Sequence, residues 1–458
     1  MHEIRFDVPF ECQGHWTLGP VEGTGRFSYD PTSGMTLDFV TSDDEIARLL
    51  SRGSGPFTIT GRTSNRQEAA FFDCYVQKHQ GTEDGRLAKF IVNRGFFGHS
   101  SARALDANII HATATMTALD EWAISGASAL EVTAFDDSEA RSFTVHADSA
   151  LRDRTVMARD AKITLKFFVA RHFDRLSARF ELQPYFEVLP LAECNFDVLI
   201  SRLVRPLENF ISLGTGRINF ARTLILKLDK GRSQVFALFP TLQAKAATPR
   251  WLTWPRGLFS LLDIDDTLAE RIVAWLDIYD RYRTVCDQLF YTLYNPQYVE
   301  AYFLSLIQIF EGYHRLRQDM TQTRMSADAY SELVAQSTKT LSSKQRRKLS
   351  AAFKHGNQVS LEQRLHEATK RFGRIIPGVL RDQDRLVFGQ DCAHMRNAMA
   401  HHLPGQQEID KAQLHTYANF ILRLLIVGLM QETGFPDAAI RHSLQNGASI
   451  IPEQRLGA

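Results

Sequence analysis

The sequence lacks any stretch of about eighteen consecutive apolar residues, the length that a membrane-spanning helix requires. Its first ten residues mix charged side chains with a proline and contain no apolar run of the kind found in secretory signals. Both absences argue against a membrane-embedded or secreted protein. We therefore expect a cytoplasmic protein with no membrane partner.

An excess of charge of one sign is also missing, because 53 Lys and Arg residues face 52 Asp and Glu residues. This balance excludes a uniformly basic nucleic-acid-binding coat, so any RNA contact must use a local basic surface. Cysteine is scarce and odd in number, without any C-x-x-C pair; the five residues are Cys12, Cys74, Cys194, Cys286 and Cys392. Such spacing is typical of reduced thiols rather than of disulfides or a cysteine-rich zinc site. We expect neither a metal nor another cofactor.

The chain is long enough for more than one hydrophobic core, and its first part is patterned for strands. Residues 26–30 and 35–39 alternate apolar and polar side chains on either side of the turn-forming residues 31–34, which predicts a hairpin. Further strands are predicted at residues 57–60, 87–92, 163–169 and 176–182. Their period of two and the spaced turns favour a sandwich or a curled sheet.

Short helical segments interrupt this β-rich part. Residues 119–122 predict a short helix over one face of the sheet, with Trp122 as a core anchor. Residues 196–210 change to helical spacing, and residues 218–228 and 234–239 predict a strand pair that closes the N-terminal unit.

Beyond a stretch punctuated by Pro240, Pro249 and Pro255, the spacing becomes helical. Apolar residues recur at three- and four-residue steps over 299–313 and again over 414–428, which predicts two long helices that frame a bundle. We expect an α+β protein with three parts. These are a β-rich, sandwich-like domain at 1–255, a helical connector at 256–290 and an all-helical domain at 291–445.

A basic stretch lies between the two framing helices. It contains Lys339, Lys344, Arg346, Arg347, Lys348 and Lys354, followed by Arg364, Lys370, Arg371 and Arg374. Such a run is usually a solvated helix face. The alternative is an RNA-binding surface, with phosphate contacts from Lys344, Arg346, Arg347 and Lys348.

The residues with the clearest chemical potential lie at 391–402, where a helical pattern must end just after His401 because Leu403, Pro404 and Gly405 follow. Asn397 is four residues before His401 and shares its face, and Arg396 lies about 100° around the helix from Asn397. Metal-independent RNA cleavage needs a proton acceptor, a proton donor and a cation at the phosphate, roles that histidine and arginine fill. A helix-terminal histidine beside a solvent-facing arginine explains the same pattern without catalysis.

The segment Met395-Arg396-Asn397-Ala398-Met399-Ala400-His401 resembles the R-N-x-x-x-H signature of HEPN ribonucleases, and its surroundings resemble the ApeA-like HEPN family of phage-defence proteins. Residues 301–316 resemble the opening helix of that family, and 360–365 resemble its middle helix. Residues 14–16, 25–39, 119–122 and 207–213 look like its companion domain. The resemblance covers most of the chain.

This resemblance implies that Arg396 binds and polarises the scissile phosphate and that His401 performs proton transfer. The sequence departs from the pattern at Ala398 and Met399, where relatives often carry an aromatic residue and a leucine. A second histidine, His402, directly follows His401. His402 is therefore the alternative candidate for proton transfer.

Two further residues enter the predicted site. Asn397 matches the polar residue that follows the arginine in the signature. Glu311, on the opening helix, either orients Arg396 or forms an exposed helical pair with Arg315. We assign His314 a structural role.

The resemblance further implies a homodimer or a higher even oligomer that cleaves RNA in abortive anti-phage defence. A phage-derived trigger would activate the protein. The β-rich domain would either sense this trigger or restrain the nuclease. One alternative is a non-catalytic helical module that binds RNA or nucleotide, with the β-rich part as its sensor or interaction domain. Another is a sugar- or peptide-binding sandwich with an inert helical appendage.

Overall fold

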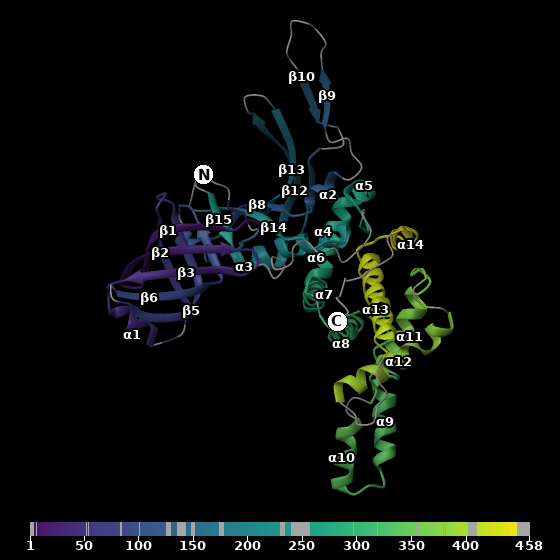
Figure 1. Ribbon diagram of the computed structural model, residues 1–458. Coiled ribbons are helices and arrows are strands. Elements are labelled where there is room, and N and C mark those ends of the chain that lie inside the picture. The colour runs from purple at the N-terminus through teal and green to yellow at the C-terminus, as the bar shows by residue number, and fades with distance from the viewer. Residues whose placement is uncertain are drawn as a thin grey trace. The chain divides into compact units, whose positions relative to one another are not determined.

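The computed structural model describes residues 4–446 except for 6, 52, 54, 83–84, 100, 125–129, 135–142, 148–151, 174–177, 230–233, 240–256, 296, 318, 354–355, 379, 381 and 402–409. The chain divides into two compact units, Met1–Asp280 and Arg281–Ala458. The first is β-rich and the second is helical, which confirms the expected α+β class (Figure 1). Pro240, Pro249 and Pro255 lie outside the described residues.

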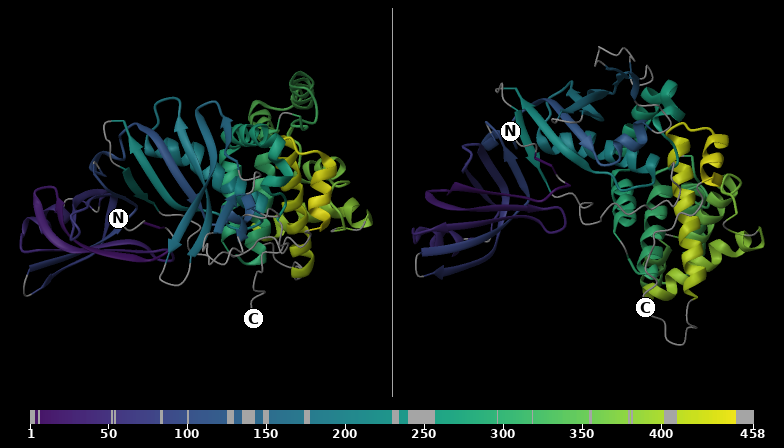
Figure 2. Two further views of the ribbon diagram at one scale, coloured as in Figure 1. Left: turned by 90° about the horizontal axis from the view of Figure 1, so that it is seen from above. Right: turned by 45° about the horizontal axis from the view of Figure 1, so that its top comes forward.

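The first six strands close into an antiparallel barrel. They are β1 (Phe10–Leu18), β2 (Val21–Asp30), β3 (Gly34–Thr41), β4 (Phe57–Thr63), β5 (Glu68–Thr82) and β6 (Gly85–Val92). The ring closes because β5 pairs with β4 along one part of its length and with β6 along another. The predicted hairpin is confirmed as β2 and β3, whose last paired residues are Asp30 and Gly34. Figure 2 shows this barrel as the purple and dark blue strands.

Aromatic side chains fill the barrel, and its wall is tight enough to require glycine. The rings of Phe27 and Phe71 stack at a centroid distance of 4.6 Å, and the indole nitrogen of Trp16 donates a 3.0 Å hydrogen bond to the carbonyl of Gly25. A Cβ atom at Gly25 would lie 1.7 Å from the carbonyl oxygen of Asp38 on β3. Only a residue without a side chain fits there.

The remaining strands extend the same sheet. Strand β7 (Arg94–Phe97) pairs with β5, and the order from β7 outward is β15 (Gln234–Leu238), β14 (Ala221–Leu228), β8 (Ile109–Met116), β13 (Ala178–Pro190), β12 (Ala161–Phe173) and β11 (Arg154–Met157). A separate hairpin joins β9 (Leu130–Ala134) and β10 (Phe143–Ala147). The thirteen-stranded sheet is continuous. Of the two forms left open by the sequence, the strands thus adopt the curled sheet.

Helices pack on this extension within the first unit. They are α2 (Leu119–Ile124), α3 (Phe196–Leu199), a π-helical turn at Ile200–Val204, α4 (Arg205–Thr215), α5 (Leu261–Ile264) and α6 (Leu268–Arg281). Helix α1 (Glu45–Ser51) follows β3 and lies at the barrel instead (Figure 1). Trp122 on α2 is buried with its ring 6.0 Å from that of Phe210, which confirms it as a core anchor. The indole nitrogen of Trp275 on α6 donates a 2.8 Å hydrogen bond to the carbonyl of Pro206. Helix α6 therefore belongs to the core of the β-rich unit.

The second unit is a helical bundle. Its helices are α7 (Arg283–Tyr294), α8 (Val299–Leu316), α9 (Ala327–Thr338), α10 (Ser343–Phe353), α11 (Leu361–Phe372), α12 (Asp382–His401), α13 (Lys411–Glu432) and α14 (Asp437–Asn446). Helices α8 and α13 run parallel, because the ammonium of Lys411 lies 3.7 Å from Glu300 at one end and Tyr313 donates a 2.6 Å hydrogen bond to Glu432 at the other. These two helices are the predicted framing pair. Helices α9 and α10 form a hairpin that extends from the bundle (Figure 1).

Helix α13 is the one helix in the described part of the chain that is long and apolar enough to cross a membrane. Most of that stretch, 78%, is buried among the other residues of the protein. A helix packed in a protein core passes the same test of length and composition.

Candidate active site on the helical unit

The signature residues lie in the last turns of α12, with apolar residues on one side and polar residues on the other. Cys392, Met395 and Ala398 are buried, and Asn397 is exposed. Arg396 lies at the border between these faces, and 34% of its side chain is exposed. The Nε of this arginine is buried without a hydrogen-bond partner among the described residues, and the rest of its side chain is partly exposed.

Helix α12 ends at His401, as the sequence predicts. Position 401 is one turn beyond the exposed Asn397 on the same side of the helix. The side chain of His401 and the whole of His402 lie outside the described residues. The choice between these two histidines therefore stays a prediction.

Glu311 on α8 makes both of the contacts that the sequence left as alternatives. One of its carboxylate oxygens lies 3.9 Å from Nη2 of Arg396 and 3.8 Å from Nη2 of Arg315. These distances are those of ion pairs and exceed hydrogen-bonding range. The carboxylate therefore restrains both guanidinium groups and leaves their Nη donors available to a substrate.

Arg315 is the member of this group that the sequence did not assign to the site. Its side chain is 56% exposed, and it shares the carboxylate of Glu311 with Arg396. Its only signal in the sequence is a four-residue spacing from Glu311, which any solvent-exposed helical pair also has. Two partly exposed guanidinium groups thus lie beside one carboxylate.

A buried polar chain lies next to this group. Arg364 is 2% exposed, and its guanidinium donates a 2.7 Å hydrogen bond to Nδ1 of His314. Because Nδ1 accepts, the proton of the neutral ring is on Nε2, which donates to Glu367 at 3.1 Å. Burial, and then the positive charge of Arg364, lower the pKa of His314. His314 is thus fully buried with both ring nitrogens hydrogen-bonded, which favours the structural role predicted for it.

The basic stretch separates into two kinds of residue. Arg364 is buried and Arg371 pairs with Asp319, so neither belongs to a free cationic surface. Three candidates on α10 are exposed and make no ion pair within the described part of the chain: Lys344, Arg347 and Lys348. The side chain of Arg346 lies outside the described residues.

Comparison with known protein families defines the class of protein. Residues 11–275 match the family model of ApeA N-terminal domain 1, and residues 304–439 match that of the Apea-like HEPN domain. HEPN domains are generally ribonucleases, and the family is associated with defence. The chain belongs to the ApeA-like HEPN proteins. Neither the curated proteins nor the solved structures gave a match.

The environment of His314 predicts a loss of stability in acid. Because its pKa is lowered in the folded state, the unfolded chain binds more protons below about pH 6.5, and the free energy of unfolding falls as the pH decreases. His314→Gln should lower stability at neutral pH but flatten its dependence between about pH 6.5 and 5. Urea unfolding followed by the helical circular dichroism signal measures this slope.

The matched control is His366→Gln, which removes an exposed histidine from α11. This variant should keep the pH dependence of the wild type. An unchanged slope in His314→Gln would show that another group causes the acid sensitivity.

Proposed function

We propose that the protein is a metal-independent endoribonuclease that acts in the cytoplasm in abortive anti-phage defence. The observation that carries this assignment is the partly exposed guanidinium of Arg396, held 3.9 Å from Glu311 at the end of the helix that bears the family signature. A fixed cation in this position suits a phosphate ligand.

The reaction is an internal transfer within RNA. The 2′-oxygen attacks the adjacent phosphorus while a base removes its proton, the bond from phosphorus to the 5′-oxygen breaks, and an acid protonates that leaving oxygen. Arg396 stabilises the negative charge that develops on the phosphoryl oxygens, and His401 carries a proton step. The products are a 2′,3′-cyclic phosphate and a free 5′-hydroxyl.

Glu311 and Arg315 complete the arrangement around the phosphate. Glu311 positions Arg396 through their ion pair, and Asn397 offers an exposed amide on the same turn. Arg315 supplies a second cation for a neighbouring phosphate, because it shares the carboxylate with Arg396. A substrate phosphate competes with Glu311 for both guanidinium groups.

Replacing either Arg396 or His401 should abolish cleavage. Arg396→Ala removes the cation at the phosphate, and His401→Ala removes a proton-transfer group, so each should lower the rate by about 10²- to 10⁴-fold. The assay incubates purified protein with total RNA in EDTA and identifies 2′,3′-cyclic phosphate ends. Full activity in either variant would contradict the assignment of these residues to the nuclease site.

Three outcomes separate the alternatives around these residues. His402→Ala should be milder than His401→Ala, and the reverse order would exchange the two histidines. Glu311→Gln should lower activity less than Arg396→Ala, because it loosens the guanidinium without removing it. Wild-type protein that shifts RNA in a gel but leaves it intact in every buffer would indicate the non-catalytic binding module instead.

We propose that α10 supplies the wider RNA-binding surface, because its exposed cations lack ion-pair partners in the described part of the chain. Changing four residues to glutamine should weaken RNA binding: Lys344, Arg346, Arg347 and Lys348. Each lost phosphate contact should reduce the slope of log affinity against log salt by roughly 0.7. Titrations at several salt concentrations measure this slope.

The control removes four exposed cations of the β-rich unit: Arg48, Arg62, Lys78 and Arg103. It should leave the slope unchanged. If both quadruple variants bind RNA as the wild type does, α10 is only a solvated helix face.

We propose a homodimer, or an even multiple of it, as the active unit. One signature offers a single arginine and one assigned histidine, whereas the reaction gains from a separate base and acid. A two-fold pairing of α12 helices would supply both.

Mixing tests this pairing. The experiment requires subunits that are shown to exchange. An excess of chains that carry both Arg396→Ala and His401→Ala should then suppress wild-type activity, because hybrid sites form. Activity that tracks only the number of wild-type chains would mean that each protomer carries a complete site.

A further inference from the structure

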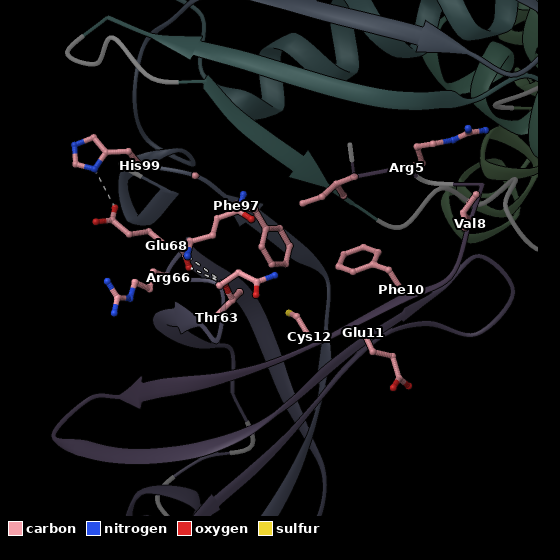
Figure 3. Close-up of a pocket in the computed structure, with 14 residues that line it drawn as sticks. Arg5, Val8, Phe10, Glu11, Cys12, Thr63, Arg66, Glu68, Phe97 and His99 are labelled. Atoms are coloured by element: carbon pink, nitrogen blue, oxygen red, sulfur yellow. Dashed lines mark hydrogen bonds and ion pairs between the residues drawn. The ribbon is translucent and has the colours of Figure 1, made fainter. Parts of the chain in front are cut away.

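An open cavity of about 1040 Å³ lies in the β-rich unit, far along the chain from the signature residues. The start of β1, the turn between β4 and β5, and the end of β7 line it (Figure 3). This volume is at the upper end of the range for small-molecule sites. We propose that the cavity binds a nucleoside phosphate.

The β4–β5 turn places an arginine where a side chain is disfavoured. Arg66 has a φ of 62°, in the left-handed region that favours glycine or asparagine. The turn enforces this conformation, since the amide of Arg66 donates to the carbonyl of Thr63 at 2.8 Å and the amide of Thr63 donates to the carbonyl of Gln67 at 2.9 Å. A strained residue with a long cationic side chain at a cavity is a candidate for ligand binding.

Three consecutive residues of this turn line the cavity with donors. Within the described residues, the side chains of Asn65, Arg66 and Gln67 have no hydrogen-bond or ion-pair partner, and Nε2 of Gln67 is buried. A buried amide donor without a partner is costly unless a ligand or water accepts from it. The turn therefore presents one cation and two amides for an acceptor-rich molecule.

The other basic side chains that line the cavity already have carboxylate partners. Arg5 forms a 2.6 Å ion pair with Asp7, and the imidazole of His99 lies 3.4 Å from the carboxylate of Glu68 (Figure 3). Arg66 is exposed and lines the cavity without a carboxylate partner among the described residues. An anion can therefore bind its guanidinium without displacing a carboxylate.

Aromatic rings form the apolar part of the lining. Phe10 is half-buried and is anchored against Phe27 and Phe97, with ring centroids 5.7 and 5.8 Å away. Phe97 lines the same cavity but is only 1% exposed, so Phe10 offers the accessible ring (Figure 3). Aromatic faces bind nucleobases by stacking, and arginine binds phosphate. A nucleoside phosphate uses both features. Inorganic phosphate would leave the ring of Phe10 uncovered, and a nucleoside would leave Arg66 without an anion.

Calorimetric titration of the full chain tests this site with six probes: AMP, GMP, CMP, UMP, adenosine and inorganic phosphate. At least one nucleotide should bind saturably, and adenosine and phosphate should bind about tenfold more weakly or worse. Arg66→Gly should weaken nucleotide binding by about tenfold or more. Its unliganded thermal midpoint should stay level or rise, because glycine adopts this φ without strain.

The matched control is Arg48→Ala, which removes an exposed arginine of α1 that does not line the cavity and should bind like the wild type. Phe10→Leu should weaken nucleotides but leave phosphate unchanged. Absence of saturable nucleotide binding, or equal affinity in Arg66→Gly, overturns the site. Equal affinity for phosphate and nucleotides overturns the recognition of a base. These outcomes do not depend on whether the protein cleaves RNA.

Discussion

The packing of α8 against α13 is the constraint on which the rest of the helical unit depends. Glu432, near the end of α13, accepts hydrogen bonds from Tyr313 at 2.6 Å and Tyr282 at 2.8 Å, and lies 3.7 Å from Arg317. A largely buried carboxylate is tolerated only when it is paired in this way. Because these contacts fix the inner face of α8, its outer face presents Glu311 toward α12. The geometry of the candidate site therefore follows from a contact in the core.

Pairing of charges also decides which arginines remain available for a ligand. Arg364 is buried with its donors directed at His314 and Gln322, so its role is structural. Arg396 and Arg315 keep partly exposed guanidinium groups beside one carboxylate. A phosphate would find two cations here that are oriented but not neutralised by close hydrogen bonds, which is the condition for electrostatic stabilisation of a reacting phosphoryl group.

In the β-rich unit, six strands pair in a closed ring, whereas β11 remains an edge strand of the extended sheet. Closure of the barrel removes the edges of six strands, and the long β5 continues into the extension through β7. The same turn that connects β4 with β5 carries Arg66, so a structural feature of the barrel also forms the wall of a cavity. One unit thus holds the proposed nuclease chemistry, and the other holds a separate candidate for ligand recognition.

The sequence by itself determined the local elements and the family. The period of two in residues 26–39 predicted the β2–β3 hairpin, and the three- and four-residue steps predicted α8 and α13. The residues after position 401 predicted the end of α12. Tertiary structure alone decided that β5 closes a barrel, that Arg364 is buried and that Arg315 meets Arg396 across Glu311. Periodicity depends on residues that are close in the chain. Each of these contacts instead depends on which side chains, distant in the chain, form ion pairs or pack together in the folded protein.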